Sequence, residues 1–158
     1  MNLDSNNIIQ MQNVAAAQHT KEERKEEKRR LREERNVIRR LNRNIPRAAR
    51  QGYYTYTWKF FPVLAGFDAA TTPEKVGKIF YDAGYKIDFN VIQSFGTEPA
   101  ALLYSNICRY IQVELEISWW PESLKKRQTW DQTITQFHQN VDIIQNDILS
   151  HLIHPYNL

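Results

Sequence analysis

The sequence predicts an α+β protein: a small three-stranded sheet packed by helices, with a long charged N-terminal helical arm and a C-terminal amphipathic helix. Three stretches alternate apolar and polar residues, as strands do, and they are separated by stretches with the 3.6-residue period of helices. Hydrophobic residues make up 42% of the chain and aromatic residues 12%, which is enough to build one core. The mean hydropathy of −0.62 is low for such an aromatic chain, so the polar residues must be concentrated in one segment.

That segment is the basic arm, residues 21–50. It holds 13 Lys and Arg against 6 Glu, whereas the remaining residues hold 8 basic against 12 acidic side chains. Strong helix formers dominate the arm and no glycine interrupts it, which predicts a helix. Residues 1–20 show no clear period and are expected to form a mobile tail, unless the run from Val14 to Ala17 extends the next helix backwards. The predicted organisation is a tail and arm at residues 1–50, followed by a compact body with its C-terminal helix at residues 51–158.

The two halves of the arm differ. The first half has almost no apolar face, so it is expected to project into solvent or to lie against a partner. The second half carries an apolar stripe that requires burial, formed by Leu31, Ile38, Leu41, Ile45 and Ala48. Pro46 is expected to end or kink this helix near Asn44, because proline lacks the N–H that continues the hydrogen-bond ladder.

Alternation and turn residues predict the elements of the body. The expected strands are residues 54–60, 85–91 and 111–119, and residues 62–70 are expected to form a loop. Thr72 is the expected N-cap of a helix with Pro73 in its first turn and Gly84 at its end. The stretch 94–110 is ambiguous, and a short helix can open at Thr97 and run through Cys108. One sheet face is apolar, and the polar face is expected to meet solvent through Thr55, Thr57, Lys59, Lys86, Asp88, Gln112, Glu114 and Glu116.

The last part of the chain predicts a helix with an apolar stripe whose members are four and three residues apart. The members of this helix seam are Trp130, Ile134, Phe137, Val141, Ile144 and Ile148. Two interpretations fit the spacing. The stripe either covers the sheet of the same chain or forms a coiled-coil seam between subunits.

No catalytic motif is visible. The five glycines are isolated, so no phosphate-binding loop is predicted, and no serine lies in a nucleophile elbow. Cys108 is the only cysteine, which excludes an intramolecular disulfide and a thiolate metal cluster. Asp147, His151 and His154 have a metal-like spacing, but surface histidines are the more ordinary explanation. We expect a protein that is not an enzyme, with no catalytic, cofactor-binding or metal-binding residues.

Location and membrane contact follow from hydropathy. No apolar run approaches the ~18–20 residues of a membrane span, and the N-terminus lacks the apolar core of a signal peptide. We therefore expect intracellular synthesis without secretion, in the cytoplasm or incorporated in a virion, and no membrane partner.

The basic arm is the segment with most functional content. The expected contacts with nucleic acid or a protein partner are made by Lys28, Arg29, Arg32, Arg35, Arg39, Arg40 and Arg43. The interleaved glutamates repel phosphate, and no aromatic residue lies in the arm to stack on bases. Residues 21–27, with three basic against four acidic side chains, are expected to add little. Nucleic-acid contact, protein docking and a solvated spacer all remain open as roles of the arm.

The element order resembles that of small proteins encoded by bacteriophages. They combine a charged helix, a strand entered at glycine, a helix closing on Gly-Tyr-Lys-Ile and a strand ending Ile-Ser-Trp. The matching residues are Gly52 to Trp58, Gly84 to Ile87, and Ile117 to Trp119, within a region from Arg39 to Trp119. The insertion at 94–110 and the C-terminal helix depart from the pattern. The resemblance implies a virion or accessory component and assigns no functional residue.

The preferred hypothesis is a non-enzymatic structural or adaptor protein, a bacteriophage virion-associated component. It would assemble through its helices with other protein subunits, either copies of itself or virion components. The alternative is a nucleic-acid-binding protein that uses the basic N-terminal helix. A small enzyme or metal-binding protein is the third hypothesis.

Overall fold

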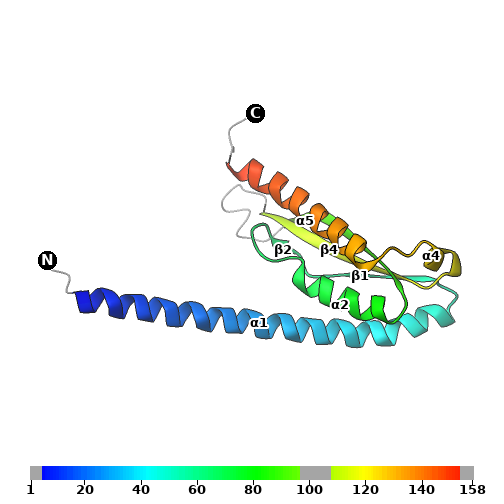
Figure 1. Cartoon of the computed structure of the whole chain (residues 1–158), viewed down its shortest axis with the longest axis horizontal. Coiled ribbons are helices and arrows are strands. Elements are labelled where there is room, and N and C mark those ends of the chain that lie inside the picture. Colours follow the sequence, from blue (N-terminus) through cyan, green and yellow to red (C-terminus); the bar gives the residue numbers. More distant parts are fainter. Residues whose placement is uncertain (1–4, 97–107, 154–158) are drawn as a thin grey trace. The chain divides into compact units, whose positions relative to one another are not determined.

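A computed structural model describes residues 5–96 and 108–153. It confirms the α+β class, with a small antiparallel sheet, a long N-terminal helix and a C-terminal helix (Figure 1). The chain divides into two compact units, residues 1–37 and 38–158. This boundary lies inside helix α1 (Ser5–Arg50), so the compact body includes the last turns of the arm.

The first unit is the N-terminal part of α1. Residues 5–20 are helical, which corresponds to the backward extension of the helix rather than to a tail without secondary structure, while residues 1–4 lie outside the described residues. This stretch contains no glycine or proline and includes three consecutive alanines. A helix that is already nucleated extends through such residues without a second nucleation cost. Every residue from 5 to 25 is exposed, so tertiary packing does not hold this stretch helical.

Of the two expectations for Pro46, an end or a kink of the helix near Asn44, the helix end is wrong. Helix α1 continues through Pro46 to Arg50. Proline in a helix interior costs roughly 3 kcal/mol because one backbone hydrogen bond is lost. Burial of Leu41, Ile45 and Ala48, which are 0%, 4% and 8% exposed, offsets this cost. The apolar stripe is thus the stronger of the two signals in this stretch.

The sheet is organised around one central strand. Its strands are β1 (Thr55–Lys59), β2 (Val63–Leu64), β3 (Lys86–Gly96) and β4 (Cys108–Ser118). Strand β4 pairs antiparallel with β1 and β2 on one side and with β3 on the other (Figure 1). The short strand β2 lies within the expected loop, where Val63 pairs with Ile111. Two residues are too few to leave a visible alternation in a sequence.

The ambiguous stretch 94–110 is partly strand. Strand β3 extends to Gly96 and β4 begins at Cys108. The rest of the short helix considered there, residues 97–107, lies outside the described residues.

The helices of the body are α2 (Thr71–Asp82), α4 (Pro121–Lys125) and α5 (Trp130–Ile153). The predicted N-cap at Thr72 is wrong, because α2 already begins at Thr71. An Asp68 carboxylate oxygen instead accepts hydrogen bonds from the Ala70 and Thr71 N–H groups, at 3.0 and 3.1 Å. At the other end Gly84 has a φ of 104°, as a helix-terminating glycine requires.

All three long helices pack on the apolar face of the sheet. Asn44 of α1 donates a hydrogen bond to the Tyr56 hydroxyl at 2.9 Å. Gly77 of α2 lies against Phe89, and the ring of Phe137 of α5 stacks on Phe89 with centroids 4.2 Å apart. The core between these layers is completed by Val76, Phe80, Ile87, Ile111, Val113, Leu115 and Ile117, all buried.

The polar face of the sheet is only partly exposed. Thr55, Thr57 and Lys59 are exposed, whereas the five expected members on β3 and β4 are half-buried. Lys59 lies opposite Glu114 in the register and its ammonium group is 3.6 Å from that carboxylate.

Candidate functional site

The first unit separates its charges around the helix axis. With 3.6 residues per turn, six cations fall within an arc of about 100°, and the six glutamates fall within an arc of about 140° on the opposite side. We call the first set the basic face: Lys21, Arg24, Lys25, Lys28, Arg32 and Arg35. We call the second set the acidic face: Glu22, Glu23, Glu26, Glu27, Glu33 and Glu34. The two signs interleave along the sequence but not on the surface of the helix.

The basic face is exposed and unpaired. All six of its side chains are exposed, and within the described part of the chain none of them forms an ion pair or a hydrogen bond. The remaining cations lie toward the acidic side and have partners there. Arg29 contacts a Glu26 carboxylate oxygen at 2.6 Å, Arg30 lies 3.9 Å from the same oxygen, and His19 lies 2.9 Å from Glu23.

This arrangement gives one side of the helix a continuous row of positive charges. The six cations extend along about 21 Å of helix axis, at a rise of about 1.5 Å per residue. A linear anion laid along them meets positive charge only, because the glutamates point to the other side. Repulsion by the glutamates, which the linear sequence suggested, is therefore much reduced on this face.

The predicted contact residues do not form one group. Lys28, Arg32 and Arg35 belong to the basic face of the first unit, whereas Arg29 is occupied by Glu26. Residues 39, 40 and 43 lie in the second unit. There Arg39 and Arg43 are exposed, and the Arg40 guanidinium lies over the ring of Trp58, 5.8 Å from its centroid.

Counting charges along the chain missed half of the basic face. Lys21, Arg24 and Lys25 were set aside because the stretch around them has more acidic than basic residues. The signal that identifies them is the 3.6-residue period of the charges, which is the same test that is applied to apolar residues.

The helix seam packs inside its own chain. Phe137, Val141 and Ile148 are buried, at 1%, 7% and 1% exposure. The other seam members, Trp130, Ile134 and Ile144, are half-buried. The contact of Phe137 with Phe89 corresponds to the interpretation in which the stripe covers the sheet.

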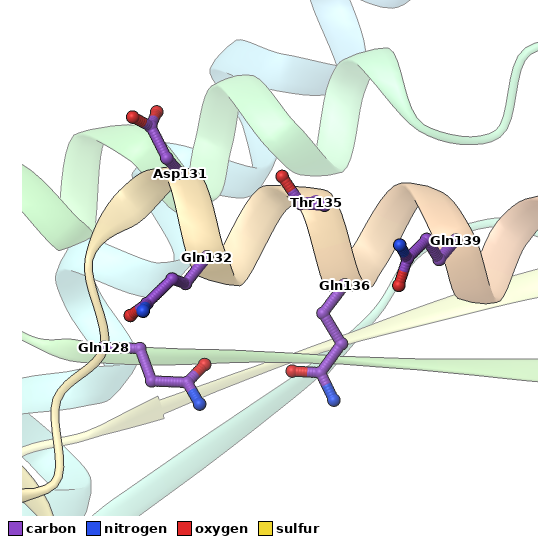
Figure 2. A pocket seen from close by; sticks show the side chains of 6 residues that line it. All are labelled: Gln128, Asp131, Gln132, Thr135, Gln136 and Gln139. Carbon is purple, nitrogen blue, oxygen red and sulfur yellow. The ribbon is translucent and has the colours of Figure 1, made fainter.

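The opposite side of α5 is rich in uncharged amides. A shallow hollow of about 540 Å³ is lined by Gln128, Asp131, Gln132, Thr135, Gln136 and Gln139, as Figure 2 shows. A second, polar pocket of about 300 Å³ joins Gln128, Gln136 and Asn140 to Asp88, Asn90 and Glu116. Neither hollow contains a histidine, cysteine or serine that would suggest nucleophilic chemistry.

Residues 5–96 and 108–153 contain no group of three or more side chains that could together hold a metal ion. Of the residues with metal-like spacing, His154 lies outside this range. None of the described helices combines the length and apolar character needed to span a membrane.

Comparison of the chain with protein-family models, with curated proteins and with solved structures finds no match.

Proposed function

We propose that this chain is a non-enzymatic structural or adaptor protein that docks on the phosphate backbone of a nucleic acid through the basic face of its arm. The observation that carries the proposal is the separation of charges on the first unit: six exposed, unpaired cations on one side and all six glutamates on the other. The arm would then attach the rigid body of the protein to the nucleic acid.

The physical reason is counterion release. Nucleic acid holds a condensed layer of cations, and each lysine or arginine that neutralises a phosphate releases one of them. Surface ion pairs between proteins gain only about 0–1 kcal/mol each, so the same six cations are worth more against a polyanion than against scattered carboxylates. Association with a bacteriophage virion, which the resemblance suggested, fits an adaptor that contacts packaged nucleic acid and is part of the same proposal.

Salt dependence tests the proposal directly. About three to five phosphate contacts are geometrically available on one side of the helix, so the log–log slope of affinity against salt on duplex DNA should be roughly −3 to −4.5. Binding should be independent of sequence, because phosphate contacts carry no base information. The measurement is a fluorescence-anisotropy titration of a labelled duplex at several salt concentrations.

Two matched variants localise the contact. Arg32→Gln with Arg35→Gln removes two charges from the basic face, and Arg29→Gln with Arg30→Gln removes two from the paired side. The first variant should make the slope shallower by about 2, and the second should change it by less than about 0.5. Equal effects of the two variants, or no binding of the intact chain at low salt, would reject the phosphate interface.

The second candidate is docking on an acidic protein surface by the same face. It is favoured by the same unpaired cations and by the absence of aromatic residues from the arm. It predicts that the intact chain captures a protein partner and that added nucleic acid does not displace this partner. The variant Arg32→Gln with Arg35→Gln should no longer capture it.

A further inference from the structure

A cluster of aromatic side chains lies at one end of the sheet, within the second unit. Tyr54 immediately precedes β1, and Trp120 lies between β4 and α4. The Tyr54 and Trp120 rings meet edge to face, with centroids 4.0 Å apart and planes at 69°. The Trp119 N–H donates a hydrogen bond to the Tyr54 carbonyl oxygen at 3.0 Å, which fixes the backbones that carry the two rings.

These rings are unusually open to solvent. Tyr53, Tyr54 and Trp120 are 61%, 48% and 39% exposed. In an edge-to-face pair one ring contributes only its edge, so this contact itself does not cover the faces of that ring. The hydrophobic core is filled by other side chains, among them Phe80, Ile117 and Leu115, so these three rings are not needed to complete it.

The last turn of α1 fixes the backbone of Tyr53. The Tyr53 N–H donates a hydrogen bond to the Ala48 carbonyl oxygen at 2.9 Å, which closes the helix. Gly52 makes this turn with a φ of 89°. Figure 1 shows the connection between α1 and β1 and the short helix α4 at the same end of the sheet.

Unpaired cations flank the aromatic cluster in the sequence. Arg47 and Arg50 are in the last turn of α1, and Lys126 follows α4. All three are exposed, and none forms an ion pair or a side-chain hydrogen bond in the part of the chain that the structure describes. Lys125 differs, because its ammonium group lies 3.2 Å from Glu122. Positive charge close to the exposed rings in the sequence favours an anionic partner that also offers planar groups.

We propose that Tyr54 and Trp120 stack on unpaired bases of a single-stranded nucleic acid, while Arg47, Arg50 and Lys126 contact its phosphates. Exposed aromatic rings beside cations are the usual elements of single-strand binding, because every base has a flat face and every linker a phosphate. A duplex hides its base faces and cannot use the rings. This inference rests on the proposed function, to which it adds a preference for single strands and a second contact outside the arm.

The experiment compares a single-stranded oligothymidylate with a DNA duplex of the same length, using the intact chain. Trp120→Ser should weaken single-strand binding by about 10-fold or more. It should leave duplex affinity and its salt slope unchanged within about 2-fold, because the arm carries the duplex contact. Trp120→Phe keeps a flat ring and should restore most of the single-strand affinity. Tyr54→Ser tests the partner ring in the same way.

Phe67→Ser is the matched control, since Phe67 is 67% exposed and lies in the connection before α2. It should alter neither affinity. Circular dichroism of each variant verifies that the fold persists.

The outcomes separate the two proposals. Unchanged single-strand affinity in folded Trp120→Ser and Tyr54→Ser proteins overturns the stacking site, and the arm interface stands if the duplex still binds. If the intact chain does not bind the duplex, the arm interface is overturned. The stacking site still stands in that case if Trp120→Ser weakens single-strand binding. An oligonucleotide that does not bind, together with a proline-rich peptide that does, would overturn the stacking site in favour of a peptide groove.

Discussion

Gly77 determines how closely α2 approaches the sheet. A Cβ atom at this position would lie 2.6 Å from the tip of the Phe89 ring and 3.5 Å from Ile87. The ring cannot easily move away, because its other side stacks on Phe137. The role of Gly77 is therefore to leave space for the close contact between α2 and the sheet. Its backbone conformation is ordinary for a helix.

Replacing Gly77 by alanine should destabilise the body, although alanine is the better helix former. We expect a loss of roughly 1–3 kcal/mol in the free energy of unfolding, the usual cost of overpacking a core. Urea denaturation followed by circular dichroism measures it. Lys75→Ala, at an exposed position on the same helix, should stay within about 0.5 kcal/mol. A more stable Gly77→Ala protein would mean that the Phe89 ring has room to turn.

Phe137 is the side chain that connects α5 to the core. It is 1% exposed and stacks on Phe89, so Phe137→Ala should cost on the order of 3 kcal/mol or more in unfolding free energy. Gln139→Ala, on the outward side of the same helix, is the control and should be nearly neutral. A loss below about 0.5 kcal/mol for Phe137→Ala would show that the Phe137 side chain is exposed to water and not part of the core.

At the scale of single elements, the sequence predicts the long strands and helices well because their periods repeat often enough to be seen. Strand β4 alternates apolar and polar residues from Ile111 to Ser118, and only its first three residues, Cys108 to Tyr110, lie in the stretch that the sequence leaves ambiguous. Prediction from the sequence fails where a local preference of the backbone is opposed by packing between distant parts of the chain. Pro46 predicts a helix end or a kink, and only the burial of Leu41 and Ile45 shows why the helix continues. Strand β2 is too short to have a period, and its partner is almost 50 residues away in the sequence.

The interrupted ladder at Pro46 leads to a prediction about α1. Pro46 is exposed, so Pro46→Ala restores a backbone donor without disturbing the core. We expect the free energy of unfolding to rise by about 1–3 kcal/mol. Thermal and urea unfolding of the variant measure the change, with Asn42→Ala at another exposed position of α1 as the reference. A lower stability would indicate that the fixed backbone angle of proline is worth more here than the missing hydrogen bond.

At the scale of the whole molecule, the candidate site was half predictable. The composition identifies the arm, because 13 of its 30 residues are basic. The basic face requires knowing that residues 21–35 belong to one uninterrupted helix, since only then do cations such as Lys21 and Lys28 share a side. The aromatic cluster needs the fold, because Tyr54 and Trp120 are 66 positions apart and meet only through the pairing of β1 with β4.

The division into two units predicts that the body folds without most of the arm. Deleting residues 1–30 removes part of the first unit and none of the second. The urea midpoint and the cooperativity of unfolding should stay close to those of the intact chain. The log–log salt slope of duplex DNA binding should become shallower, because cations of the basic face are removed. A non-cooperative transition in the shortened protein would show that the early part of α1 belongs to the core.

The central position of β4 has a consequence for the order in which the chain folds during synthesis. Strand β1 finds no partner until β4 has been made, because Lys59 pairs with Glu114 and Thr55 with Ser118. At roughly 5–20 residues per second, the ribosome needs about 3–12 s to supply the missing strand. The N-terminal part of α1 is exposed over residues 5–25, so it needs only local contacts and forms within microseconds once it has emerged. A nascent chain therefore presents its basic helix to nearby RNA for seconds before the sheet exists.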